Sequence, residues 1–156
     1  MRGDKKVVEQ LNLALKGELT AIVQYMVQSE LCGNWGYGRL ADITKRRAIE
    51  EMKHAEALIE RIVFFDSVPD VKLSLSPTIG SDVPQQFEAG LADEISAARE
   101  YNQAVEICRE AGDSGTRELF ERLLHDEERH VDFLESQLHS LKEAGLGAYL
   151  AEQMKK

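Results

Sequence analysis

Two short segments of the sequence repeat the pattern Glu-x-x-His, one from Glu51 to His54 and one from Glu127 to His130. In a helix, residues three apart lie on one face, so each segment can present a carboxylate and an imidazole to a single ion. Oxygen-rich ligation with one nitrogen per metal suits iron or manganese. A single copy is a weak signal, because exposed or ion-paired side chains explain most isolated copies.

The two copies belong to a longer internal repeat, which makes the pattern more specific. Glu18 precedes Glu51 in the chain by the same separation as Glu94 precedes Glu127. The constant offset that relates these positions also relates Tyr25 to Tyr101 and Cys32 to Cys108. Repetition of this kind indicates that one structural unit occurs twice. We therefore expect two equivalent helical hairpins that bring four glutamates and two histidines to the same level.

These glutamates lie on apolar helix faces. Glu18, for example, is flanked at helical spacing by Leu15 and Ile22. Each carboxylate buried without compensation costs several kcal/mol, whereas two divalent cations balance four carboxylates and two neutral imidazoles. The pattern thus predicts a dinuclear metal centre. Tyr25 and Tyr101 are expected to donate hydrogen bonds to neighbouring carboxylates.

Long helices are needed to position these residues. Apolar side chains at three- and four-residue spacing predict helices over about 5–32, 39–65, 82–111 and 116–142, followed by a short helix to Met154. Ser81 or Asp82 would cap the third helix, with Pro84 in its first turn. The connector over 66–81 is long enough to travel the length of a helix. We expect an all-α, ferritin-like four-helix bundle with one long crossover and a short fifth helix, forming a single domain over residues 1–156.

Composition limits the classes of function. The chain has 156 residues and a formal net charge of −9, which argues against a nucleic-acid partner. No uncharged stretch approaches the ~20 residues that span a bilayer, and the first residues lack the apolar core of a secretory signal. We expect no membrane partner and a cytoplasmic location. Two cysteines without a C-x-x-C spacing are expected to be reduced and partly buried.

Along essentially its whole length, the sequence resembles the bacterioferritin family. The segments that carry the resemblance are Met1 to Asp4, Asn34 to Gly36, Glu50 to Ala55, Asp126 to His130 and Gly145 to Leu150. The resemblance implies a ferroxidase that oxidises Fe²⁺ with O₂ or H₂O₂ and stores ferric mineral inside a shell of 24 identical chains. It also implies haem b at each two-fold interface and a small ferredoxin as the reductant for iron release.

The resemblance also implies roles for single residues. Glu18 and His54 would bind one iron, Glu94 and His130 would bind the other, and Glu51 and Glu127 would bridge the two. Met52 and the same methionine of a second chain would coordinate the haem iron through sulfur.

The helical position of Met52 is consistent with a site away from the metal centre. Met52 follows Glu51 and so points about 100° away from it. Its face continues through Ala48, Ala55 and Ile59. Leu19, Val23 and Met26 form a similar second stripe on the first helix, and an apolar stripe of this kind suggests a subunit interface.

Two other functions remain open at this stage. The chain could be a small di-iron or di-manganese oxidase or peroxidase that forms no shell, in which case particle size would distinguish it. It could also be a haem-binding or purely structural bundle whose interior acids pair with lysine and arginine. The metal content of the purified protein separates this last possibility from the others.

Overall fold

The chain folds into four long helices and one short one. A computed structural model describes residues 1–72 and 74–155, and within these residues there is no strand. The helices are α1 (Lys5–Asn34), α2 (Gly38–Phe64), α3 (Val83–Glu110), α4 (Ser114–Ala144) and α5 (Leu146–Gln153). The all-α prediction is confirmed, and the observed bounds differ from the expected ones by a residue or two.

Three aspartates determine where the long helices begin. The carboxylates of Asp4, Asp82 and Asp113 accept hydrogen bonds from backbone N–H groups in the first turns of α1, α3 and α4. A cap of this kind stabilises a helix by about 1 kcal/mol. The expected cap at Asp82, with proline in the first turn, is confirmed. Because Asp113 caps α4, that helix begins at Ser114, slightly before the expected start.

The two hairpin turns share one geometry. Gly36 and Gly112 have φ angles of 90° and 70°, in the left-handed region that favours glycine. In each turn the following N–H donates back to a cysteine carbonyl, from Tyr37 to Cys32 and from Asp113 to Cys108. This bond satisfies a carbonyl at the end of the preceding helix. The internal repeat is therefore present in the backbone as well as in the sequence.

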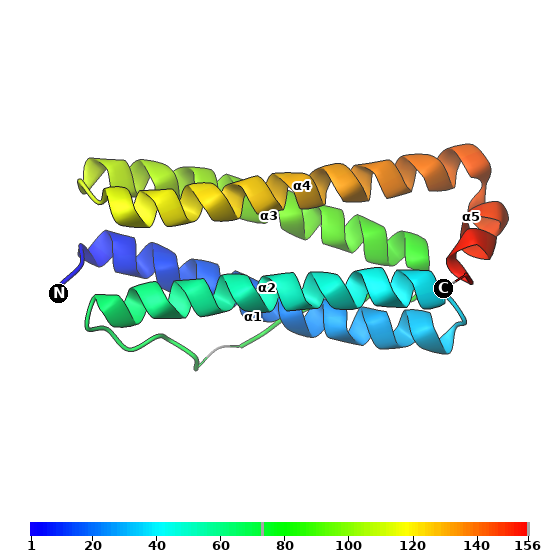
Figure 1. Cartoon of the computed structure of the whole chain (residues 1–156), viewed down its shortest axis with the longest axis horizontal. Coiled ribbons are helices and arrows are strands. Elements are labelled where there is room, and N and C mark those ends of the chain that lie inside the picture. Colours follow the sequence, from blue (N-terminus) through cyan, green and yellow to red (C-terminus); the bar gives the residue numbers. More distant parts are fainter. Residues whose placement is uncertain (73, 156) are drawn as a thin grey trace.

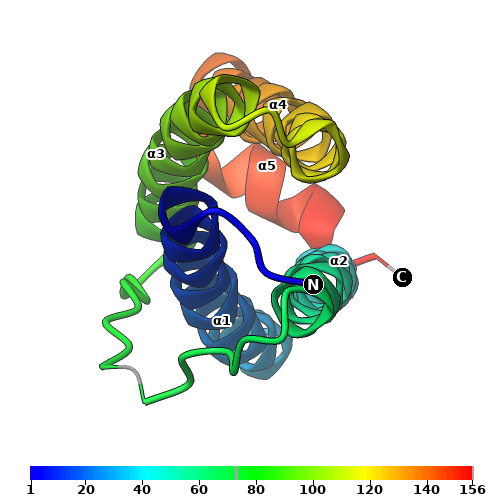
Figure 2. The ribbon, with the colours of Figure 1, turned by 90° about the vertical axis from the view of Figure 1, so that its left-hand side faces the viewer.

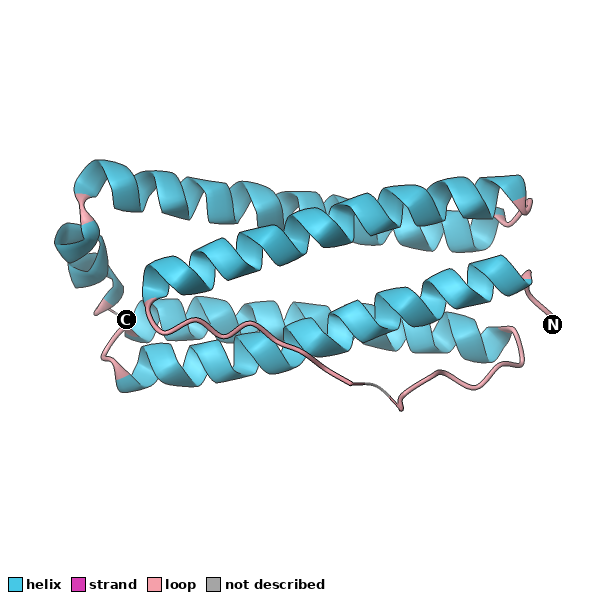
Figure 3. Cartoon of the chain, turned by 180° about the vertical axis from the view of Figure 1, so that it is seen from behind, coloured by secondary structure: helices cyan, strands magenta, loops and turns pink. Residues whose placement is uncertain are grey.

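The four long helices form a bundle with one long crossover. α1 and α2 make one antiparallel hairpin and α3 and α4 the other, while α5 lies across one end (Figures 1 and 2). The crossover between α2 and α3 runs along the outside of α1 for the length of the bundle (Figure 3). As a result α2 and α3 point in the same direction, and the predicted ferritin-like topology is confirmed.

Polar side chains of α1 hold the crossover in place. The Gln28 side-chain amide donates to the carbonyl of Ile79, at 2.9 Å. The Gln24 carbonyl accepts from the backbone N–H of Thr78, and its amide donates to Asp93 on α3. Both glutamines are buried. The crossover is therefore fastened to α1 and α3 beside the middle of the bundle.

Two apolar clusters fill the interior. One, around Leu11, Leu58 and Phe120, lies toward the N-terminal end of α1, and the other contains Leu40 and Phe87. Tyr149 of α5 packs on Phe87, with ring centroids 6.0 Å apart. Cys32 and Cys108 belong to different clusters and are free and buried, as expected. None of the described helices is long and apolar enough to cross a membrane.

Candidate metal centre

Six buried polar side chains meet between the two apolar clusters, and they are the six that the sequence singles out. Each long helix contributes to the group, with one glutamate from α1, one from α3, and a Glu-x-x-His pair from α2 and from α4. The members are Glu18, Glu51, His54, Glu94, Glu127 and His130. They form two overlapping sets of four residues, within which the potential ligand atoms lie no more than 4.8 Å apart.

Each histidine turns its Nδ1 atom toward the carboxylates. The Nδ1 atom of His54 lies 3.5 Å from Glu18 Oε1, and the Nδ1 atom of His130 lies 3.6 Å from Glu94 Oε2. The two imidazole rings are stacked, with centroids 6.3 Å apart. One glutamate and one histidine therefore belong to each half of the cluster.

The two remaining glutamates face both halves. Glu51 places Oε2 3.8 Å from His54 Nδ1 and Oε1 3.2 Å from His130 Nδ1. Glu127 places Oε1 and Oε2 at 3.6 Å from the same two nitrogens. Each of these carboxylates lies between the two imidazoles and has one oxygen directed to each side.

The tyrosines take the positions that the repeat predicts. Tyr25 of α1 donates a hydrogen bond of 2.6 Å to Glu94 on α3, and Tyr101 of α3 donates to Glu18 on α1. The expected hydrogen-bonding role of both hydroxyls is confirmed. Since burial first, and then the nearby carboxylates, raise the pKa of Tyr101, its hydroxyl remains a donor. These bonds fix one oxygen of each outer glutamate.

Two acidic residues that received no role at this centre in the sequence analysis contact the outer nitrogens of the histidines. His54 Nε2 lies 2.8 Å from Asp126 Oδ2, and His130 Nε2 lies 2.7 Å from Glu50 Oε2. A carboxylate at Nε2 favours the tautomer that leaves Nδ1 free to bind an ion. Glu50 and Asp126 are also related by the offset of the internal repeat, which is the signal that could have identified them.

The electrostatics of the cluster reflect carboxylates crowded in a buried space. Burial, together with the neighbouring Glu51 and Glu127, raises the pKa of Glu18 well above its usual value. Burial lowers the pKa of His130, but the nearby carboxylates of Glu127 and Glu51 outweigh it and raise that pKa to about 9. Among the described residues, no lysine or arginine forms an ion pair with any of the four glutamates.

The donor set fits a pair of divalent cations. Several buried atoms have no hydrogen-bond partner among the described residues, including His54 Nδ1, His130 Nδ1 and both carboxylate oxygens of Glu127. Buried polar atoms left in this way are expensive. Because these atoms of the two histidines and Glu127 face the centre of the cluster, two cations there would satisfy them and would neutralise the four carboxylates.

A cavity connects this cluster to the outside of the bundle between α1 and α3. Its volume is about 340 Å³, and Glu18, Glu94 and Glu127 form part of its wall. Asp93 and Glu100 of α3 and Ser76 of the crossover also line it. Burial raises the pKa of Glu100. A small cation can therefore reach the carboxylates past other acidic side chains.

Met52 follows the buried Glu51 on α2 but lies on a different face of that helix, and it is 46% exposed. The expected face around it is partly wrong, because Ala48 and Ala55 are buried within the chain. Ala55 is part of the apolar cluster around Leu58. Ile49 is the apolar residue near Met52 in the sequence that reaches the surface. On α1, Val23 and Met26 of the expected stripe are exposed.

Comparison with known proteins identifies close relatives. The model of the ferritin-like domain matches residues 8–144. A bacterioferritin of Brucella melitensis is 44% identical over 149 residues, which cover 96% of this chain and 92% of the relative. A bacterioferritin of Mycolicibacterium paratuberculosis is 41% identical over 152 residues, covering 97% and 96% of the two chains. One from Rhodobacter capsulatus is 43% identical over 138 residues, covering 88% and 86%.

Proposed function

The chain belongs to the bacterioferritin family of ferritin-like proteins, and we propose that it stores iron after oxidising Fe²⁺ to Fe³⁺ at the buried cluster. One observation carries this proposal, namely that Glu51 and Glu127 each direct one oxygen toward His54 and the other toward His130. Carboxylates in that orientation can bridge two ions. Two Fe²⁺ ions held side by side can each give up one electron to the same oxidant molecule.

The remaining side chains define the two ion positions. Glu18 and His54 would bind one Fe²⁺, and Glu94 and His130 would bind the other. Four carboxylates hold the charge of two divalent ions, and hard oxygen donors also suit the trivalent product. Oxidation is therefore easier with this ligand set than with a neutral one.

The protein's own contribution is geometry and charge. The hydroxyls of Tyr25 and Tyr101 each hold an outer glutamate in one orientation. Asp126 and Glu50 orient the imidazoles from behind. Apolar clusters lie on either side of the centre along the bundle, and the acidic cavity between α1 and α3 provides a route for Fe²⁺. O₂ or H₂O₂ is the electron acceptor. Two Fe²⁺ ions supply two electrons, which together with two protons from water reduce one O₂ to H₂O₂ or one H₂O₂ to two molecules of water.

Storage requires an assembly, and we propose that 24 chains form a hollow shell that holds the ferric mineral. Support comes from the bacterioferritin relatives, which match along almost the whole chain. It also comes from the apolar side chains on the outer face of α1 and α2, which a single chain leaves exposed. Such a face is typical of a subunit interface.

The exposed thioether of Met52 fits haem b between two chains. Its surroundings on the chain include apolar Ile49, which is 41% exposed, and a second copy would supply the second sulfur. When bound, haem b would pass electrons between an external donor and the interior. A small ferredoxin is the donor we propose for the release of stored iron.

The ferroxidase proposal is tested by replacing a bridging carboxylate. Glu127→Ala removes two of the buried oxygens that face the histidines, so it should abolish rapid oxidation of Fe²⁺ while leaving assembly intact. Stopped-flow absorbance of ferric iron after mixing with oxygenated Fe²⁺ measures the rate, and size-exclusion chromatography checks the assembly.

Glu128→Ala is the matched control, because Glu128 is the next residue on the same helix and is exposed. Its oxidation rate should equal that of the unaltered protein. If Glu127→Ala oxidised Fe²⁺ as fast as this control, the cluster would not be the ferroxidase centre.

A further inference from the structure

The two halves of the cluster follow one template, so their differences are informative. The internal repeat pairs each glutamate, histidine and tyrosine of one half with its counterpart in the other. The hydrogen bonds repeat as well, from Tyr25 to Glu94 and from Tyr101 to Glu18. Two ion positions built in this way would bind equally if nothing else distinguished them.

One difference concerns the carboxylates that contact the Nε2 atoms of the two histidines. Asp126, which holds His54, is itself bound to the guanidinium of Arg129 through its other oxygen. Glu50, which holds His130, is 46% exposed and has no other hydrogen-bond partner among the described residues. Lys53 stands where the repeat would place the counterpart of Arg129, and it forms no ion pair with Glu50 in the described part of the chain. The imidazole of His54 is therefore held more firmly than that of His130.

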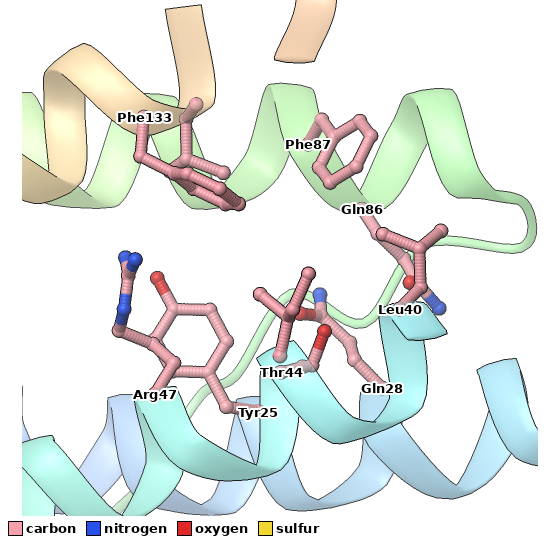
Figure 4. A pocket seen from close by; sticks show the side chains of 10 residues that line it. Tyr25, Gln28, Leu40, Thr44, Arg47, Gln86, Phe87 and Phe133 are labelled. Carbon is pink, nitrogen blue, oxygen red and sulfur yellow. The ribbon is translucent and has the colours of Figure 1, made fainter. Parts of the chain in front are cut away.

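A second difference is a charge. Arg47 has Leu123 as its counterpart in the other half. Its guanidinium lies 5.4 Å from the ring centroid of Phe133 and forms no ion pair among the described residues. Figure 4 shows the Arg47 side chain next to that of Tyr25, in the wall of a small cavity between the hairpins. Since Tyr25 donates to Glu94, this uncompensated charge lies on the side of Glu94 and His130.

The charge acts against a cation at the near position. Arg47 lines the same small cavity as Tyr25, which donates to Glu94, and a doubly charged ion bound at Glu94 would feel about twice the repulsion from Arg47 that a singly charged ion would feel. The other half has no such cation, because Leu123 is apolar and buried and Arg129 is already paired with Asp126. Both differences weaken the binding of a divalent ion at Glu94 and His130.

We propose that the two positions of this centre are unequal, and that a divalent ion binds more tightly at Glu18 and His54 than at Glu94 and His130. The inference rests on the proposed function, since it concerns the same dinuclear site. It makes Arg129 and Asp126 positioning residues for one ion, and it makes Arg47 the residue that keeps the other ion exchangeable.

The test measures where the first ion binds. Crystals of the whole protein are grown with Co²⁺ below one equivalent per chain, and anomalous scattering at the cobalt edge gives the occupancy of each position. Occupancy at Glu18 and His54 should exceed that at Glu94 and His130 by about tenfold. This is the lower end of the effect on metal affinity of residues that hydrogen-bond to a metal ligand.

Variants then assign the cause. Arg47→Leu copies the residue of the other half and should reduce the occupancy ratio by about threefold, the effect expected when one solvent-screened charge is removed. Arg46→Leu makes the same change at the exposed neighbouring position and should leave the ratio unaltered. Arg129→Ala, at a side chain that is 70% exposed, should lower occupancy at Glu18 and His54.

The possible failures are distinguishable. Equal occupancies in the unaltered protein, or a higher occupancy at Glu94 and His130, would overturn the inequality and leave the dinuclear centre standing. An Arg47→Leu variant with an unchanged ratio would remove Arg47 as a cause. Absence of cobalt from both positions would overturn the inference and the proposed function together.

Discussion

The residues at the centre of the bundle are stable there only with compensation for their charge. In the metal-free chain the compensation comes in part from protons, because the carboxylates raise the pKa of His130 to about 9. Two cations would replace these protons and also satisfy the orphaned atoms of Glu127. Metal binding and proton release are therefore expected to be coupled at this site.

The two cysteines provide a test of burial at the residue scale. Burial raises the pKa of Cys32 and of Cys108 to about 11. At pH 8 only about 0.1% of each thiol is then the reactive thiolate, and the fraction rises as the pH approaches 11. We expect iodoacetamide to alkylate the folded protein very slowly at pH 8 and faster with each unit of increasing pH.

Mass spectrometry of the alkylated chain measures this reactivity, and the urea-unfolded chain, in which both thiols are accessible, is the control. Alkylation of the folded protein at pH 8 at the rate of the unfolded chain would contradict the buried positions of both cysteines.

The sequence predicts more about this centre than about its surroundings, and the reason is geometric. Periodicity and the internal repeat determine which helix face a glutamate occupies, so the meeting of Glu18, Glu51, Glu94 and Glu127 could be expected. Which side chain reaches across from one helix to another depends on rotamers and on interhelical distance. The contacts of Asp126 with His54 and of Glu50 with His130 depend on such rotamers and distances, so the sequence did not predict them.

At the scale of the elements, the crossover is the feature with the least regular sequence. Its attachment depends on Gln24 and Gln28, which are polar residues on a helix face that periodicity alone would assign to apolar packing or to solvent. The length of the connector allowed α2 and α3 to be parallel, as the expected ferritin-like fold requires. The fastening points could not be predicted, because they are hydrogen bonds to backbone atoms far along the chain.

Gln24→Ala tests this fastening. The change leaves the backbone N–H of Thr78 and the side chain of Asp93 without their partner, so it should destabilise the fold by about 1–3 kcal/mol. Thermal unfolding followed by circular dichroism measures the change. Gln103→Ala, at an exposed position of α3, should unfold at the temperature of the unaltered protein. Equal unfolding temperatures for the two variants would show that the crossover does not depend on Gln24.

At the scale of the whole molecule, the single chain leaves an apolar surface on α1 and α2. Val23, Met26 and Ile49 are each more than one third exposed, as is Met52. Pairing with a second copy would remove these side chains from water, at about 25 cal/mol per Å² of apolar surface. We expect this face to be the contact at which two chains share a haem.

Two substitutions separate haem binding from pairing. Met52→Leu removes the sulfur and keeps the apolar volume, so the protein should lose or alter its Soret absorbance and keep its sedimentation coefficient. Ile49→Glu places a charge in the same face and should disrupt both haem binding and the pairing of two chains. Protein expressed with added haem is compared by absorbance and analytical ultracentrifugation. Unchanged Soret absorbance in Met52→Leu would contradict the assignment of Met52 as haem ligand.

The most direct test of the dinuclear centre is the number of Fe²⁺ ions that each chain binds before any oxidant is admitted. Anaerobic calorimetric titration should give two tightly bound Fe²⁺ per chain, and none at the same affinity in a Glu51→Ala, Glu127→Ala double variant that still folds and assembles. If the double variant bound two Fe²⁺ per chain as tightly as the unaltered protein, or if the unaltered protein bound none, the six side chains would not be a ferroxidase centre.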